Sequence, residues 1–346
     1  MSTDRGRITI SGFDAKRVER REPLSDWTDS RVAETPNRWT HAWMEFRCNR
    51  SAMLGLYIVA VMTLLAVFAR PITVAGTTVQ PISLAPYDPG AILYVQGLDV
   101  SAYEPPSLAH PFGTDGSARD VFSRVLFGGR FSLSIGFIVV IVTATIGLFY
   151  GAIAGYYGGW VDEVMMRTVD LIFAFPGLLL ALIIVAVLGN GYWELVLAFT
   201  AFGWAGYARL IRGEILKIKE QEYVLAAKAL GARDRRVIFR HVVPNAIAPL
   251  VVQASLSVGT VVIGVAALGF LGLGLPAGSA EWGTMLDQTR ETIVQGPGGS
   301  IPWWVTVFPG GAIFLFVMSM NLIGDGINDA LDAREGEEVT RGGGGL

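Results

Sequence analysis

The chain alternates between long apolar runs and polar segments. A helix needs about 20 apolar residues to cross the hydrocarbon core of a bilayer, and six runs without a charged residue approach or exceed that length. The pattern therefore predicts an all-α, polytopic membrane protein with six transmembrane helices. The six runs are Ser51–Ala69, Phe131–Val161, Leu171–Trp193, Leu195–Ala208, Ala246–Ala280 and Thr292–Gly324.

The last two runs are longer than one span requires, so helix breakers are expected inside them. The fifth helix is expected to end at Gly272, Gly274 and Pro276, whereas Pro302 is expected to begin the sixth. The fourth run is short. Trp193 and Tyr207 lie at its two ends, however, and aromatic residues of this kind favour membrane interfaces.

Composition agrees with this pattern. The 346 residues are 52% hydrophobic and only 16% charged, whereas soluble domains average about a quarter charged. The net charge of −3 gives no reason to expect a nucleic-acid partner. The single cysteine, Cys48, excludes an intramolecular disulfide.

The distribution of basic residues predicts the orientation, because Lys and Arg concentrate in cytoplasmic loops. Most of the 27 Lys and Arg residues fall in segments that alternate spans would place on one side, chiefly 1–50 and 209–245. We therefore expect a protein of the cell membrane with both termini in the cytoplasm. The predicted division is a cytoplasmic tail at 1–50, a first helix at 51–70, an irregular, proline-rich extracellular loop at 71–120, a core domain with the other five helices at 121–334 and a flexible tail at 335–346.

The polar segment 209–245 has structure of its own. Glu222–Leu230 is rich in helix formers, and Tyr223, Ala226, Ala227 and Leu230 recur at the spacing of one helical face. Gly231 follows where a left-handed C-cap requires glycine. Asp234 is expected to cap a second short helix, Arg235–Val242, and Pro244 to end the segment. Such a face suits either the groove of a partner protein or, for so basic a loop, an anionic lipid surface.

The same segment carries a resemblance to a known family. The run from Glu222 to Gly231, followed by Ile238, His241, Pro244 and Asn245, resembles the cytoplasmic EAA loop of binding-protein-dependent ABC importer permeases. Three further stretches resemble the dipeptide, oligopeptide and nickel permease family, in its "C" type subunit. They are His110–Phe137, Leu268–Leu286 and Asn321–Arg334. One departure is Ala118, where this family usually has glycine.

The resemblance implies a type I ABC importer permease fold and a set of partners. A companion permease would form the other half of the path, and two cytoplasmic ATPases would hold ATP and Mg. An extracellular binding protein or lipoprotein would deliver the substrate. The helix at Glu222–Gly231 would sit in a cleft of one ATPase and transmit its closure, so that Glu222, Tyr223, Ala226, Ala227, Leu230 and Gly231 are the predicted coupling residues.

The chain itself is not expected to be an enzyme. A phosphate-binding loop ends in Gly-Lys-Ser or Gly-Lys-Thr, and no lysine here follows a glycine. ATP hydrolysis is therefore expected in partner subunits, and no cofactor in this chain. The three histidines show no metal-ligand spacing.

The remaining question is what crosses the membrane, and where. Gln253 and Ser257 in the fifth run and Asn321 in the sixth are candidate path residues, since polar residues in spans usually face the bundle interior. Hydrogen bonds between helices are the alternative role. Peptides are the predicted cargo, with nickel or another small solute as the alternative. An ion-coupled carrier is disfavoured, because the six runs contain no ionisable Asp, Glu, Lys, Arg or His.

Overall fold

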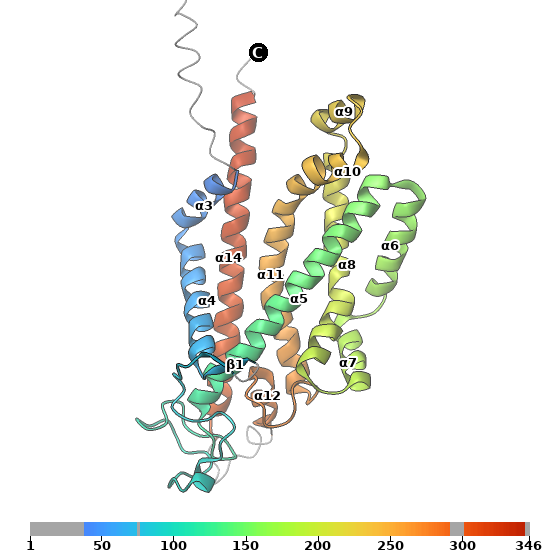
Figure 1. Cartoon of the computed structure of the whole chain (residues 1–346). Helices are drawn as coiled ribbons and strands as arrows, with labels where there is room; N and C mark the ends of the chain where they lie inside the picture. Colours follow the sequence, from blue (N-terminus) through green and yellow to red (C-terminus); the bar gives the residue numbers. More distant parts are fainter. Residues whose placement is uncertain (1–37, 75–76, 291–300, 343–346) are drawn as a thin grey trace, which may run out of the picture. The chain divides into compact units, whose positions relative to one another are not determined.

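The computed structural model describes residues 38–74, 77–290 and 301–342. The chain divides into two compact units, Met1–Met44 and Glu45–Leu346, and α3 (Arg38–Cys48) spans the boundary. The second unit is mostly helical (Figure 1). Its long helices are α4 (Arg50–Phe68), α5 (Val121–Tyr157), α6 (Gly159–Phe173), α7 (Gly177–Leu188), α8 (Tyr192–Ile218), α11 (Val243–Phe270) and α14 (Trp304–Gly342). Its short ones are α9 (Glu222–Ala229), α10 (Asp234–Val237), the π-helical turn η2 (Ile238–Val242) and α12 (Trp282–Asp287).

Within the described residues, four helices are long and apolar enough to cross a membrane. They are α4, α5, the continuous helix Asp234–Phe270, and Trp304–Leu331 within α14. The pair α6 and α7 makes a fifth if it counts as one span. Helix α8 has 27 residues, about 40 Å at 1.5 Å per residue, but its last part is charged. The polytopic helical architecture is confirmed, and the expected count of six is compatible with it.

The third expected span, Leu171–Trp193, is not one helix. Helix α6 ends at Phe173 and α7 begins at Gly177, and their axes differ by 79°. The cause is Pro176, which precedes α7 in an extended conformation. A proline has no N–H to continue the helix and disfavours the helical conformation of the residue before it.

The second and fifth spans begin earlier than the apolar runs indicate. Helix α5 starts at Val121, ten residues before Phe131, because the side chain of Asp120 accepts the backbone N–H of Ser123 and caps it.

The expectation that Pro244 ends the cytoplasmic segment was wrong, since one helix runs from Asp234 to Phe270. A π turn before the proline explains the continuity. The N–H of Val243 donates to the carbonyl of Ile238, five residues back. The hydrogen-bond pattern of the helix is therefore already shifted at Pro244, which has no N–H to donate.

The end of the fifth span and the start of the sixth agree with expectation. Helix α11 ends at Phe270, and Gly272 follows with φ of +77°, which favours glycine. Helix α14 begins at Trp304, two residues after Pro302.

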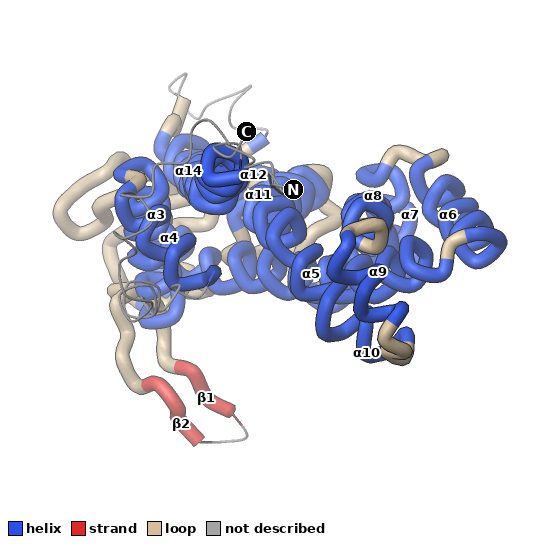
Figure 2. Tube along the Cα trace, turned by 90° about the horizontal axis from the view of Figure 1, so that it is seen from above, coloured by secondary structure: helices blue, strands red, loops and turns tan. Residues whose placement is uncertain are grey.

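Helix α5 runs obliquely across α11 and packs most extensively on α8 (Figures 1 and 2). Glycines permit this close approach. A Cβ atom on Gly147 would lie 2.3 Å from the Cβ of Tyr207, and one on Gly151 would lie 2.4 Å from the carbonyl oxygen of Ala208. Small residues at helix interfaces in membranes allow such backbone contact, and the two helices therefore form one tightly packed pair.

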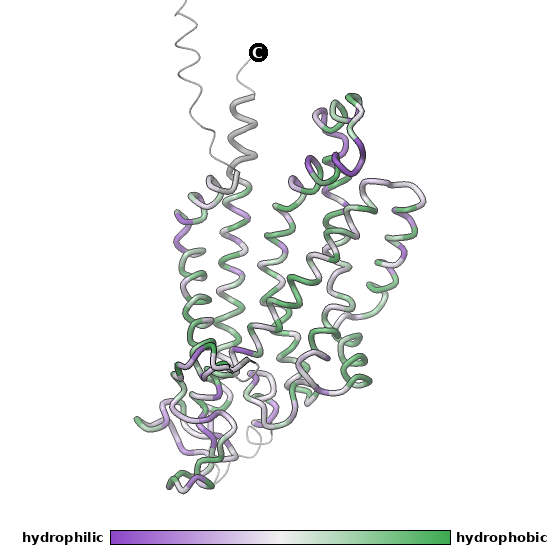
Figure 3. The backbone as a smooth tube through the Cα atoms, in the orientation of Figure 1, coloured by the Kyte–Doolittle hydropathy of each residue, from purple (hydrophilic) through white to green (hydrophobic). Residues whose placement is uncertain are grey.

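Polar residues gather at the two ends of the helices (Figure 3). At one end lie α9 and α10. At the other lies 71–120, which is largely irregular apart from a hairpin of β1 (Ile72–Val74) with β2 (Thr77–Gln80) and the 3-10 turn η1 (Leu93–Gln96). The prolines indicate this irregularity, whereas the hairpin was not predicted.

Candidate functional site

The polar segment 209–245 is mostly built into the neighbouring helices. Its first residues continue α8 to Ile218, and everything from Asp234 onward belongs to the helix that ends at Phe270. Only residues 219–233 connect the two, and we call them the α9 segment. The candidate site is thus a short connection held between two long helices.

Helix α9 matches the expected element closely. It covers Glu222–Ala229, and Gly231 follows with φ of +80°. The N–H of Gly231 donates to the carbonyl of Lys228, and that of Ala232 to the carbonyl of Ala227, so the helix closes in a left-handed C-cap. A Cβ atom on Gly231 would meet nothing within 4 Å. The backbone conformation alone therefore requires glycine here.

The predicted apolar face of α9 points largely away from the rest of the described chain. Tyr223 is 45% exposed and Leu230 88% exposed, and Ala226 is exposed as well. Ala227 is half-buried at the edge of this face, and Glu222 is exposed at the start of the helix. This leaves an apolar surface of a short helix open to a partner.

The opposite side of α9 anchors the helix through Val224, which is fully buried. Sequence analysis missed this residue, although its spacing of three from Ala227 is a helical signal. It packs in a cluster with residues of α8, α10, η2 and α5, so the α9 segment is joined to several long helices. The fully buried members of that cluster are Ile211, Ile215, Val224, Val237, Val242 and Ala246.

Tyr156, near the end of α5, contacts Lys228 of the α9 segment and the adjoining Asp234. Its hydroxyl donates a 2.6 Å hydrogen bond to Asp234, and the ammonium of Lys228 lies 4.6 Å from its ring centroid. Lys219 donates to the carbonyl of Gly155 at 3.0 Å. The expectation that Asp234 caps the second short helix was wrong: Arg233 occupies that position without a side-chain hydrogen bond, and the carboxylate of Asp234 accepts the tyrosine hydroxyl instead.

Residues of the family-like run also meet each other. The side-chain amide of Asn245 donates to the hydroxyl of Tyr223 at 3.2 Å and to the carbonyl of His241 at 2.6 Å. The rings of Tyr223 and His241 lie 6.4 Å apart. These contacts fix α9 against the start of α11, across more than twenty residues of sequence.

The candidate path residues are only partly brought together. Gln253 and Ser257 share one face of α11, and the amide of Gln253 donates to the hydroxyl of Ser257 at 3.3 Å. Asn321 lies exposed on α14, and no hydrogen bond among the described residues joins it to the other two. Their role stays a prediction.

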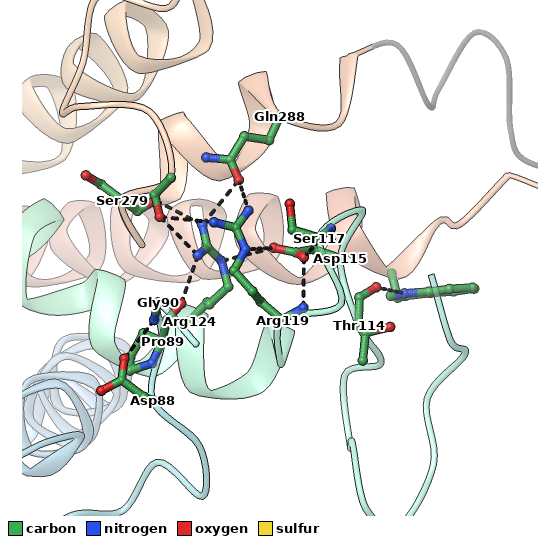
Figure 4. Close-up of polar contacts among 12 residues, drawn as sticks. Asp88, Pro89, Gly90, Thr114, Asp115, Ser117, Arg119, Arg124, Ser279 and Gln288 are labelled. Atoms are coloured by element: carbon green, nitrogen blue, oxygen red, sulfur yellow. Dashed lines mark hydrogen bonds and ion pairs between the residues drawn. The ribbon is translucent and has the colours of Figure 1, made fainter. Parts of the chain in front are cut away.

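At the other end of the helices, two of the family-like stretches meet around buried Arg124 (Figure 4). This side chain is fully buried and donates to the carbonyls of Pro89, Gly278 and Ser279, at 2.9, 3.2 and 3.0 Å. The start of α5 is thereby joined both to segment 71–120 and to the loop after α11.

Arg119 extends this network. It donates to Asp115 at 2.8 Å and to Gln288 at 2.8 Å (Figure 4). Asp115 also accepts the backbone N–H groups of Ser117 and Arg119, which closes a tight turn around Ala118. Ala118 is buried and has φ of +54°, a left-handed conformation that glycine adopts without strain.

Glu281 is a second buried charge that sequence analysis missed. It caps α12 by accepting the N–H groups of Gly283 and Thr284, and it accepts the hydroxyl of Ser132 on α5. No short-range signal marks Arg124, since its carbonyl partners are distant in sequence. Glu281 caps a helix two and three residues ahead, but its contact with Ser132 is also distant in sequence. Within the described ranges, no cluster of His, Cys, Asp and Glu could hold a metal ion.

Comparison with known families gives two matches. Residues 147–336 match the model of the binding-protein-dependent transport system inner membrane component. Residues 37–106 match the N-terminal transmembrane domain of oligopeptide transport permease C. Together they cover α4, the end of α5 and the helices that follow it, including the α9 segment, but not residues 107–146.

Three curated relatives are similar to this chain over most of its length. The dipeptide transport system permease protein DppC of Alkalihalophilus pseudofirmus is 40% identical over 88% of this chain and 92% of its own length. The oligopeptide transport system permease protein OppC of Bacillus subtilis is 38% identical over 86% and 90%. The glutathione transport system permease protein GsiD of Shigella dysenteriae is 41% identical over 86% and 90%.

Among solved structures, an inward-facing form of the MetNI methionine ABC transporter is similar, with a TM-score of 0.49 and 17% identity, over 61% of this chain and 95% of that chain.

Proposed function

The chain belongs to the family of binding-protein-dependent transport system inner membrane components, and from that premise we propose how it acts as the peptide permease subunit of an ABC importer. The relatives transport dipeptides, oligopeptides and glutathione by their names, all of which contain peptide bonds. Peptides are accordingly the proposed cargo here. Nickel and other small solutes remain the alternative that uptake measurements decide.

The proposed coupling element is the exposed face of α9, and this face is the observation that carries the mechanism. Tyr223, Ala226 and Leu230 present apolar surface outward, whereas Val224 anchors the helix inward. An amphipathic helix of this kind fits an apolar groove on a partner protein. The partner is a cytoplasmic ATPase that binds ATP and Mg, and a second ATPase serves the companion permease.

Movement of α9 would reach the membrane helices through α5. Tyr156 joins the end of α5 to Asp234 and Lys228, and the glycines of α5 pack it directly onto α8. A shift of the docked helix therefore moves a packed unit of α5, α8 and the start of α11, rather than a loop. Such rigid-body motion is a common basis for switching between two states of a pathway.

The proposed orientation follows the distribution of basic residues. The α9 segment and both termini face the cytoplasm, and residues 71–120 face outward, where a binding protein or lipoprotein would deliver peptide. A companion permease forms the other half of the path. Gln253, Ser257 and Asn321 are proposed to line this chain's half.

Uptake by the reconstituted complex tests the function. The chain, its companion permease and both ATPases are placed in vesicles with the binding protein, and labelled dipeptides, longer peptides and nickel are offered in separate arms. ATP-dependent accumulation of peptide is expected. Accumulation of nickel alone would move the cargo to the alternative, and peptide uptake driven by an ion gradient without ATP would contradict the proposal.

A further inference from the structure

A groove lies beside α9 on the first turns of the long helix that begins at Asp234. Its volume is about 570 Å³, and its lining is strongly basic. All of the charged lining residues are exposed arginines. The lining consists of Arg233, Arg235, Arg236, Phe239 and Arg240.

The four guanidinium groups have no acidic partner in the described part of the chain. No ion pair there includes any of them, although Arg209 and Arg212 of α8 are paired with Asp170 and Asp162. Asp234 is the only acidic residue between Gly231 and Asn245, and its carboxylate accepts the hydroxyl of Tyr156. The groove therefore has a surplus of positive charge that this chain does not neutralise.

The position of the groove indicates what neutralises it. The helix from Asp234 to Phe270 is apolar enough to cross a membrane, so its first two turns lie where the membrane meets water. Figure 1 shows α10 nearer to the membrane helices than α9. Phe239 is 54% exposed between the arginines, and an aromatic ring among basic side chains is typical of a membrane interface.

We propose that this groove binds the phosphate headgroups of anionic phospholipids. Guanidinium groups bind phosphate oxygens through paired hydrogen bonds, and Phe239 supplies an apolar contact for the upper acyl chain. In the proposed orientation the lipids belong to the cytoplasmic leaflet. The apolar face of α9, with Tyr223 and Leu230, is a separate surface that remains available to the ATPase.

The consequence for transport is a fixed depth for the start of α11. Headgroups in the groove keep α10 at the membrane surface, so that the packed unit that follows α9 moves along the membrane and not out of it. Because α10 also receives the Tyr156 hydrogen bond, the bound lipid adds a fixed point close to where α5 and α9 meet. Anionic lipid is thus expected both to bind in the groove and to increase the amount of peptide taken up per ATP hydrolysed.

The test measures lipid retention directly. The full chain with its companion permease, without ATPases, is purified from nanodiscs of phosphatidylcholine mixed with phosphatidylglycerol, and native mass spectrometry counts the retained phosphatidylglycerol. The double variant Arg235→Gln/Arg236→Gln should bind it about 25-fold more weakly, about fivefold for each charge. Arg167→Gln is the control, since Arg167 is exposed but lies in an ion pair with Glu163, and it should retain the wild-type amount.

Two further measurements fix the interpretation. Arg235→Lys/Arg236→Lys keeps the charge and should retain most of the lipid, which excludes a folding defect as the cause of loss. ATPase recovery from the complex should stay normal in the Gln double variant. If that variant retains the wild-type amount of phosphatidylglycerol, the proposal is overturned, and a loss of ATPase alone would assign the groove to the ATPase instead. These outcomes do not depend on which solute is carried.

Discussion

The hydroxyl of Tyr156, near the end of α5, donates a 2.6 Å hydrogen bond to the carboxylate of Asp234 at the start of α10. The two residues are 78 positions apart, and the ring of Tyr156 also faces the ammonium of Lys228 on α9. One side chain near the end of α5 therefore contacts both short helices, α9 and α10. If α9 receives movement from an ATPase, Tyr156 gives α5 a direct contact through which it can follow α9.

Tyr156→Phe isolates the hydrogen bond, because the ring and its contact with Lys228 remain. A hydrogen bond of this kind contributes about 1 kcal/mol, so the chain should insert and fold normally. Peptide uptake per ATP hydrolysed should fall, while ATPase recovery stays unchanged. Tyr157→Phe is the matched control, since Tyr157 is an exposed neighbour. An unchanged ratio of uptake to hydrolysis in Tyr156→Phe would show that this contact does not transmit movement.

Gly231→Val tests the left-handed turn after α9. A side chain with a β-carbon costs roughly 1–2 kcal/mol at the observed φ of +80°, and a branched one costs more. The membrane helices do not depend on this turn, so membrane abundance should be normal while ATPase recovery and uptake fall. Gly213→Ala is the control, because Gly213 lies within α8 and a Cβ atom there would meet nothing within 4 Å.

Leu230→Asp tests the exposed face of α9 without disturbing the chain itself. Leu230 is 88% exposed, and surface substitutions of this type usually change stability by less than about 0.5 kcal/mol. A charge in an apolar groove should nevertheless abolish ATPase co-purification. Leu108→Asp makes the same change at a fully exposed position of segment 71–120 and should leave co-purification intact. Equal ATPase recovery from both variants would mean that this face is not the docking surface.

The sequence predicted features that depend on neighbouring residues better than features that depend on contacts with distant helices. The helix at Glu222–Ala229 and the turn at Gly231 were predictable, because helix propensity and a positive φ are properties of neighbouring residues. The role of Val224 was not evident, since burial depends on α5 and α8 lying beneath it. Pro244 was misread for a related reason: a π turn absorbs the missing hydrogen bond, and no short motif announces such a turn.

The same distinction applies to the charged residues. The apolar runs predicted that membrane helices exist, yet Arg124 and Glu281 join segments more than a hundred residues apart. The partners of Arg124 are mainly backbone carbonyls, which look alike at every position of a sequence, and Glu281 meets a serine of a distant helix. At Ala118 the sequence showed only a departure from the family's usual glycine. The left-handed conformation, which glycine adopts without strain, became evident in the structure.

Ala118→Gly should stabilise segment 71–120. The observed φ of +54° is strained for alanine by roughly 1–2 kcal/mol, which exceeds the approximately 0.4–1 kcal/mol that glycine adds to the entropy of the unfolded chain. A small rise in thermal midpoint is expected for the detergent-solubilised protein. Ala280→Gly is the control, since Ala280 is also buried but has no positive φ, and it should lower the midpoint. A lower midpoint for both would show that Ala118 is unstrained.

Arg124→Gln tests whether the buried arginine holds the outer end of the protein together. The carbonyls of Pro89, Gly278 and Ser279 each lose a charged donor, and Asp115 loses a cation 3.4 Å away. Breaking a buried pair in this way typically costs about 3–5 kcal/mol. Segment 71–120 should become sensitive to added protease, while the α9 segment, at the other end of the helices, should still recover the ATPases.

Arg70→Gln provides the comparison, because Arg70 lies in the same outer region but its ion pair with Asp88 is exposed. Exposed pairs contribute about 0–1 kcal/mol, so protease resistance should hardly change. Arg124→Lys separates charge from shape: a lysine keeps the charge but has one ammonium in place of the planar fork that reaches several carbonyls at once. It should restore only part of the resistance. Full resistance in Arg124→Gln would mean that segment 71–120 is held by its apolar contacts alone.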